Sequence, residues 1–171
     1  MGGTRQSGTT KTGILKLGET EASRTSPVGL FHYAHSYSVS AATLTKSGIR
    51  VTHPEAPIRF LYTHAIELYL KSFLMVKGIS LARLRSRALG HDLCALFREA
   101  VNLGLVPDRP MESEISSLND AIRDRYIETG VRHILPIQAL HSLCESLNRQ
   151  VGPIIYSIAK ITRSPASLPT L

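Results

Sequence analysis

The segment from about Pro54 or Pro57 to Gly78 constrains this fold most, because it is apolar on nearly every side. A helix that is hydrophobic all round is buried among other elements. We therefore predict a long helix at the centre of a helical bundle. At helical spacing one stripe of it carries Leu61, Ala65, Leu68, Ser72 and Met75, and the opposite side carries Phe60, Leu70, Phe73 and Leu74.

Three titratable residues interrupt this apolar helix on one face: His64, Glu67 and Lys71, spaced three and four apart. Burying such groups costs free energy unless they are paired. We expect Glu67 and Lys71 to be sheltered and to face each other as an ion pair, with His64 as a hydrogen-bonded neighbour. The alternative is that the three side chains line a polar pocket inside the bundle.

Most of the remaining chain also has helical periodicity, so we predict an all-α fold, an antiparallel bundle of about five helices. Ser26 and Pro27 signal the start of the first helix, and Gly48 signals its end. The other helices are expected from Asp92 to Gly104, from about Met111, and from Pro136, the last kinked or interrupted at Gly152-Pro153.

At 171 residues, with 43% hydrophobic and 19% charged residues, the chain has the composition of one globular domain. We expect a flexible tail at 1–26, the helical domain at 27–162 and a C-terminal tail at 163–171. Cys94 and Cys144 are too few for a disulfide framework, and the first residues lack the apolar run of a signal peptide. We expect a cytoplasmic protein with no membrane partner.

The net charge of +7 and the sequence pI of about 9.7 favour polyanionic partners such as RNA, or an acidic protein. Arg83, Arg85, Arg87 and His91 lie in one connector that contains no acid. Guanidinium groups bind phosphate bidentately, and the amides at the start of the next helix, at Asp92, also favour anions. We predict that these five residues form a binding site. The alternative is a solvated basic connector.

His32 and His35 are three residues apart, a spacing that can hold a metal ion. No cysteine or carboxylate cluster accompanies them, and zinc takes about four ligands. The other histidines have no neighbouring nucleophile, and the sequence contains no phosphate-binding Gly-rich loop or dinucleotide-binding fingerprint. We expect neither a metal nor another cofactor.

Several short motifs occur in the order and spacing of the HEPN superfamily of small helical-bundle domains, which the chain resembles over about residues 28–160. The motifs are Ala65-Ile66-Glu67-Leu68-Tyr69-Leu70-Lys71 with Gly78, Gly90-His91-Asp92-Leu93 with Leu96 and Ala100, Asn102-Leu103-Gly104-Leu105, and Arg125-Tyr126. The resemblance implies RNA or nucleotide binding, commonly as a homodimer. It also implies a prokaryotic toxin–antitoxin or defence setting, in which such domains are fused or paired with nucleotidyltransferases.

Active members of that superfamily are metal-independent endoribonucleases with an arginine and a histidine separated by roughly four to six residues. Arg85 and His91 have five residues between them but lie ahead of the third helix, whereas the pair of the superfamily lies in a later helix. Arg125 and His133 lie later but have seven residues between them, including Gly130. Neither pair meets both criteria.

We therefore expect an RNA-, nucleotide- or partner-binding module without robust catalysis. The first alternative is an endoribonuclease in which Arg85 stabilises charge and His91 acts as general acid or base, or in which Arg125 and His133 do so. The second alternative is a structural or antitoxin-like subunit paired with a nucleotidyltransferase.

Overall fold

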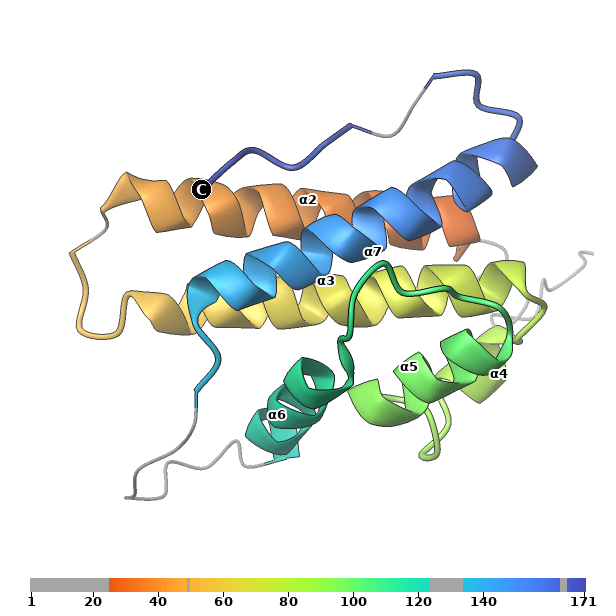
Figure 1. The fold of residues 1–171 in the computed structure, drawn as a ribbon, viewed down its shortest axis with the longest axis horizontal. Helices are drawn as coiled ribbons and strands as arrows, with labels where there is room; N and C mark the ends of the chain where they lie inside the picture. Colours follow the sequence, from red (N-terminus) through yellow and green to blue (C-terminus); the bar gives the residue numbers. More distant parts are fainter. Residues whose placement is uncertain (1–24, 49, 124–133, 164–165) are drawn as a thin grey trace, which may run out of the picture.

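The computed structural model describes residues 25–48, 50–123, 134–163 and 166–171, and this part of the chain is all-helical, without a strand (Figure 1). The prediction of an all-α bundle is confirmed. Its helices are α2 (Pro27–Ser47), α3 (Glu55–Val76), α4 (Leu81–Leu84), α5 (Leu93–Asn102), α6 (Glu112–Arg123) and α7 (Ile137–Ile158).

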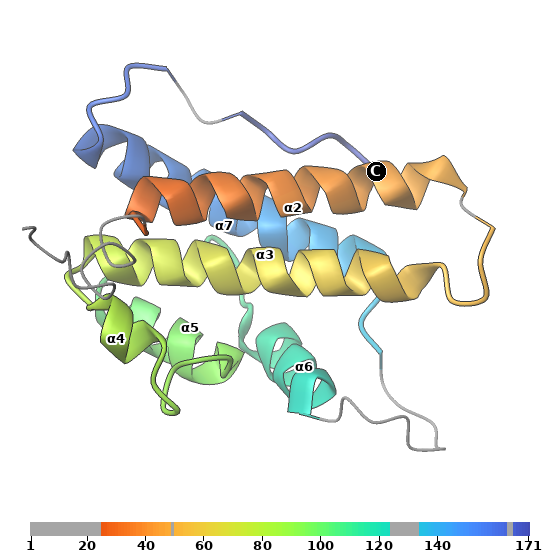
Figure 2. The same ribbon diagram turned by 180° about the vertical axis from the view of Figure 1, so that it is seen from behind.

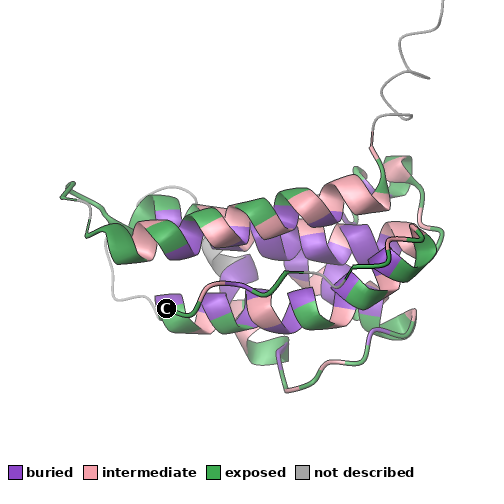
Figure 3. Ribbon diagram, turned by 90° about the horizontal axis from the view of Figure 1, so that it is seen from above, coloured by how far each residue is buried: buried purple, intermediate pink, exposed green. Residues whose placement is uncertain are grey.

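The three long helices α2, α3 and α7 lie side by side, and the short helices α4, α5 and α6 lie along the other side of α3 (Figures 1 and 2). Helix α3 contacts α2, α7 and α5. It is therefore the central helix, as its apolar residues on nearly every side predicted. The buried residues of the helices form one hydrophobic core, and Figure 3 marks them in purple along the ribbon. No helix in the described ranges is long and apolar enough to cross a membrane.

The helix ends follow local signals in the sequence. The Ser26 side chain accepts a hydrogen bond from the Gly29 amide at 3.0 Å, and Gly48 ends α2 in the left-handed region at φ 60°. The Asp92 side chain accepts from the Ala95 amide at 2.9 Å and caps α5 as expected. Helix α4 was not predicted. Its four residues are capped by Ser80 inside what the sequence suggested was an irregular connector.

The predicted interruption at Pro153 is wrong, because α7 runs without a break from Ile137 to Ile158. Proline removes one helical hydrogen bond and crowds the preceding turn, at a cost of about 3 kcal/mol. Val151, Ile155 and Tyr156 are buried on both sides of it, and burying such side chains contributes about 1.5–3 kcal/mol each. The core contacts therefore offset the local penalty.

The C-terminal segment packs back on the bundle and runs along α2 and α7 (Figures 1 and 3). The Asn148 side-chain amide donates a hydrogen bond to the Ala166 carbonyl at 2.9 Å, and Leu168 is buried in the core. The expected C-terminal tail thus contributes one leucine to the hydrophobic core.

Candidate functional site

Glu67 and Lys71 form the expected ion pair on α3. The Lys71 ammonium donates to Glu67 Oε1 at 2.6 Å, and the two side chains are 13% and 8% exposed, respectively. They are four positions apart in the sequence, which places both on one face of the helix. The prediction that the pair is sheltered and that its members face each other is confirmed.

The second oxygen of the same carboxylate contacts His91, which lies just ahead of α5. His91 Nδ1 is 3.2 Å from Glu67 Oε2, while the His91 side chain is 71% exposed. A carboxylate only accepts hydrogen bonds, so Nδ1 carries the proton in this contact, and Nε2 of the neutral ring is left as an acceptor. The structure thereby joins two motifs that the sequence suggested separately.

His64 lies beside this pair and is held by ring contacts. Its ring centroid is 4.8 Å from that of Tyr37, edge to face, and 5.9 Å from that of Phe60, with ring planes 12° apart. Burial lowers the pKa of His64, Glu67 opposes that shift, and the basic side chains of Lys71 and His91 add to it. Among the described residues His64 makes no hydrogen bond, so the expected one is absent there. We call His64, Glu67, Lys71 and His91 the polar cluster.

The turn before His91 depends on a glycine. The Gly90 amide donates to the Ser86 carbonyl at 2.7 Å, and a Cβ added to Gly90 would lie 2.9 Å from that same oxygen. Leu89 is buried and anchors the turn to the core. A residue with a side chain at position 90 would displace the turn, so glycine here fixes where His91 meets Glu67.

Of the three connector arginines, one forms an ion pair with a described residue and two do not. Arg83 donates to Glu99 of α5 at 2.8 Å, so the charge of Arg83 is compensated by an acid outside the connector. Arg85 and Arg87 are exposed, and neither makes an ion pair within the described part of the chain. Residues 67–99 contain six Lys and Arg against three Asp and Glu, so this region is basic.

Two amides at the start of α5, where the sequence suggested anion binding, have partners within the chain. The Leu93 amide donates to the Asn119 side chain at 2.8 Å, and the Ala95 amide is bonded to Asp92. Asp92 therefore acts as a helix cap, and its negative charge lies where an anion would bind. The groups on this surface that remain available to bind an anion are Arg85, Arg87 and the exposed imidazole of His91.

One of the two candidate Arg–His pairs lies in the described part of the chain. Arg85 and His91 both lie in the connector, on either side of the Ser86–Gly90 turn, and they are not hydrogen-bonded to each other. Arg125 and His133 lie outside the described residues. The residue that orients His91 is Glu67, which sequence reasoning assigned to the core and not to the site.

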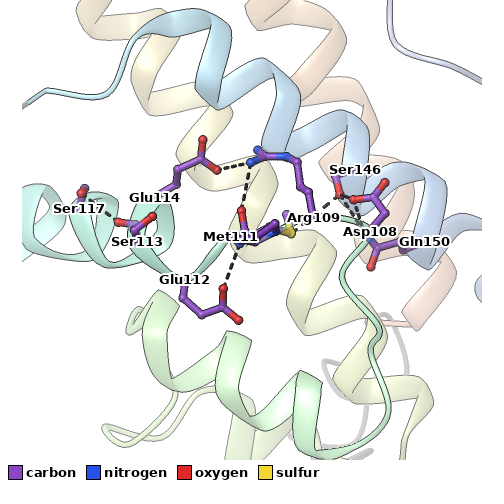
Figure 4. Close-up of polar contacts among 10 residues, drawn as sticks. Asp108, Arg109, Met111, Glu112, Ser113, Glu114, Ser117, Ser146 and Gln150 are labelled. Carbon is purple, nitrogen blue, oxygen red and sulfur yellow. Dashed lines mark hydrogen bonds and ion pairs between the residues drawn. The ribbon is translucent and has the colours of Figure 1, made fainter.

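A further polar network, not anticipated from the sequence, ties the loop between α5 and α6 to α7 (Figure 4). Asp108 accepts hydrogen bonds from Ser146 and from Gln150, the latter at 3.1 Å, and pairs with Arg149 at 2.8 Å. The Ser146 hydrogen bond and then Arg149 lower the pKa of Asp108. These contacts from one carboxylate to three residues of α7 hold the loop against that helix.

A Tyr–His–Glu chain, in which Tyr62 and His141 are buried and Glu145 is partly exposed, crosses the interface of α3 and α7. The Tyr62 hydroxyl is 3.0 Å from His141 Nδ1, and His141 Nε2 is 3.5 Å from Glu145. Burial lowers the pKa of His141, and Glu145 opposes that shift. Tyr62 is fully buried, so a substrate has no access to its hydroxyl and the chain serves packing.

His32 and His35 line a pocket of about 270 Å³ between α2, α7 and the C-terminal segment. His32 Nε2 is 3.3 Å from the Tyr156 hydroxyl, and burial lowers the pKa of His35. Across the described ranges, no three His, Cys, Asp or Glu side chains come together as a metal site. The pocket is lined by Phe31, His32, His35, Ser36, Tyr156, Arg163 and Ala166.

The polar cluster together with Arg85 and Arg87 is therefore the best candidate for a functional site. It combines an oriented, exposed imidazole with guanidinium groups that have no ion-pair partner in the described part of the chain. Comparison of the chain with protein-family models, with curated proteins and with solved structures finds no match.

Proposed function

We propose that the surface around Arg85, Arg87 and His91 binds the phosphates of single-stranded RNA or of a nucleotide. The observation that carries the proposal is the position of His91. Its Nδ1 lies 3.2 Å from Glu67 Oε2, and the same connector carries two exposed arginines without ion-pair partners in the described chain. Guanidinium groups are typical ligands of phosphate oxygens. Because Nδ1–H of His91 is bonded to Glu67, the imidazole contributes a hydrogen bond to phosphate from Nε2 when the ring is protonated. The resemblance to HEPN domains, which implies RNA or nucleotide binding, supports the same ligand class.

The charge distribution favours side-chain recognition of phosphate. Glu67 is buried and paired with Lys71, so its charge is largely screened from a ligand at the surface. Arg83 is compensated by Glu99 and contributes less than Arg85 and Arg87. Binding by exposed cations releases counterions from the nucleic acid, so affinity falls steeply as salt rises.

The test is fluorescence anisotropy with a labelled, mixed-sequence, single-stranded RNA over a range of salt concentrations. For the double variant Arg85→Gln/Arg87→Gln we expect weaker binding and a salt slope smaller by about 1.4, from about 0.7 for each phosphate contact. The control Lys46→Gln/Arg50→Gln removes the same charge from exposed positions at the α2–α3 connection, at the opposite end of α3 from α4 (Figures 1 and 2).

Equal losses of RNA affinity in the two double variants would show that only the net charge of the protein matters. The proposed surface would then be wrong. No RNA or nucleotide binding by the wild type at low salt would contradict the proposal as a whole. In that outcome the alternative of a structural subunit with a protein partner would be favoured.

One observation favours a second candidate function, endoribonuclease activity. A carboxylate that accepts from one imidazole nitrogen and leaves the other exposed is the usual arrangement for a histidine that acts as general base. Here His91 would take or give the proton and Arg85 would stabilise charge on the phosphate. The assay is RNA cleavage in EDTA by the wild type, His91→Ala and His133→Ala. Robust cleavage that only His91→Ala abolishes would replace the binding proposal with this one.

A further inference from the structure

Two large aromatic side chains are exposed on the face that carries the polar cluster. Phe60 of α3 is 67% exposed and Tyr33 of α2 is 64% exposed. Rings of this size normally bury most of their surface, so two exposed rings on adjacent helices need a reason. Tyr37 and His64 lie on the same two helices, and we call Tyr33, Tyr37, Phe60 and His64 the aromatic strip.

The rings of the strip are held in fixed positions. His64 is stacked on Phe60 with ring planes 12° apart. Tyr37 of α2 contacts His64 edge to face, with an angle of 71° between the ring planes. Tyr33 lies one helical turn from Tyr37 and therefore on the same side of α2. With one side of the Phe60 ring toward His64 and most of the ring exposed, a flat partner has a rigid surface on which to stack.

The strip continues into the polar cluster along α3. Phe60, His64, Glu67 and Lys71 are spaced four, three and four apart, so they follow one face of the helix. Phe60 and Glu67 are about 10.5 Å apart along the axis, at 1.5 Å per residue. Glu67 contacts His91, so the exposed aromatic surface lies within a short stretch of single strand from the proposed phosphate-binding residues.

We propose that the aromatic strip is a base-stacking subsite, in which Phe60 stacks on an unpaired base of a nucleic acid whose backbone follows His91, Arg85 and Arg87. This inference rests on the proposed function. Stacking surfaces combined with a basic track are the usual means of binding single strands without sequence preference. The excess of basic residues over 67–99, beside the exposed rings, complements a polyanion better than an apolar protein surface.

The test compares wild type with Phe60→Leu, which keeps an apolar side chain and removes the ring. Phe60 is exposed, so the variant should fold, and circular dichroism verifies this. We expect the affinity for single-stranded RNA to fall at least about fivefold, with the salt slope unchanged and the affinity for a duplex of the same sequence unchanged. Val106→Ala, at an exposed apolar position in the α5–α6 loop, is the control and should bind as wild type does.

A second measurement reports stacking directly. In a single strand that contains 2-aminopurine, wild type should quench the fluorescence of this base, and Phe60→Leu should quench it less at saturating protein. Salt-sensitive binding that depends on Arg85 and Arg87, with no change in affinity or quenching for Phe60→Leu, would overturn the subsite and leave the proposed function intact. Lack of binding by the wild type would overturn both. Dissociation of a dimer by Phe60→Leu, with unchanged RNA affinity, would show that a second copy of the chain covers the strip.

Discussion

Glu67 and His91 are 24 residues apart in the chain, yet Glu67 Oε2 lies 3.2 Å from His91 Nδ1. The contact gives one carboxylate two partners, because Lys71 binds its other oxygen at 2.6 Å. Lys71 belongs to the same helix as Glu67, whereas His91 comes from the connector that carries the arginines. The carboxylate therefore links the buried core to the exposed basic surface.

The first prediction concerns the stability of this link. Glu67→Gln keeps the shape of the side chain but leaves the sheltered Lys71 ammonium without a counter-charge, so we expect a loss of about 3 kcal/mol in the free energy of unfolding. Glu55→Gln is the matched control, because Glu55 and Arg59 form an exposed pair at the same spacing on the same helix. That change should cost less than about 1 kcal/mol in urea denaturation. Equal losses would show that burial of the Glu67 pair has no energetic consequence.

The second prediction concerns Gly90. In Gly90→Ala the new methyl group would overlap the Ser86 carbonyl oxygen, so the turn must shift, and we expect a destabilisation of about 1–3 kcal/mol. RNA affinity should fall as well, because His91 follows directly in the chain and would move away from Glu67. Ala88→Ser, an exposed change in the same turn, should stay within about 0.5 kcal/mol and bind normally. A stable, fully binding Gly90→Ala would disprove the role of this turn.

The third prediction concerns pH. The pKa of His141 is lowered by burial, while an unfolded histidine takes up its proton near pH 6.5. Below that pH the unfolded chain binds more protons than the folded one, so the free energy of unfolding should fall between pH 7 and pH 5.

His141→Asn keeps a group that can hydrogen-bond Tyr62 but removes the titration, so the stability of this variant should fall less over the same pH range. His53→Asn, at an exposed position between α2 and α3, is the control and should retain the wild-type slope. Thermal unfolding at several pH values measures both. Identical slopes for His141→Asn and wild type would contradict the assignment.

The fourth prediction concerns the loop network of Figure 4. The pKa of Asp108 is lowered, so its stabilisation is present above its ordinary pKa of about 3.8 and is lost as the pH falls through the lower folded value. Asp108→Asn should cost no more than about 1 kcal/mol at pH 7, because the carboxylate is partly exposed. The difference from wild type should shrink in acid. A double-mutant cycle with Ser146→Ala should show coupling, and additive losses would argue against the network.

Local features of the fold were predictable because their physics acts over one or two helical turns. The caps at Ser26 and Asp92 and the pair of Glu67 with Lys71 all join residues three or four apart. The apolar residues on nearly every side of α3 also predicted its central place in the bundle. The break expected at Pro153 failed for the opposite reason, because the core contacts of α7 outweigh a local preference.

The sequence by itself determined an all-helical chain with a sheltered ion pair and a basic connector. Only the tertiary structure decided which of these features meet. It pairs Glu67 with His91 and Arg83 with Glu99, and it places His64 against Tyr37 of the neighbouring helix α2. The Leu93 amide of α5 donates to Asn119 of α6, and the Ala95 amide donates to Asp92. These contacts join residues of different elements, and their distances depend on how the helices pack, which residue spacing along one helix does not specify.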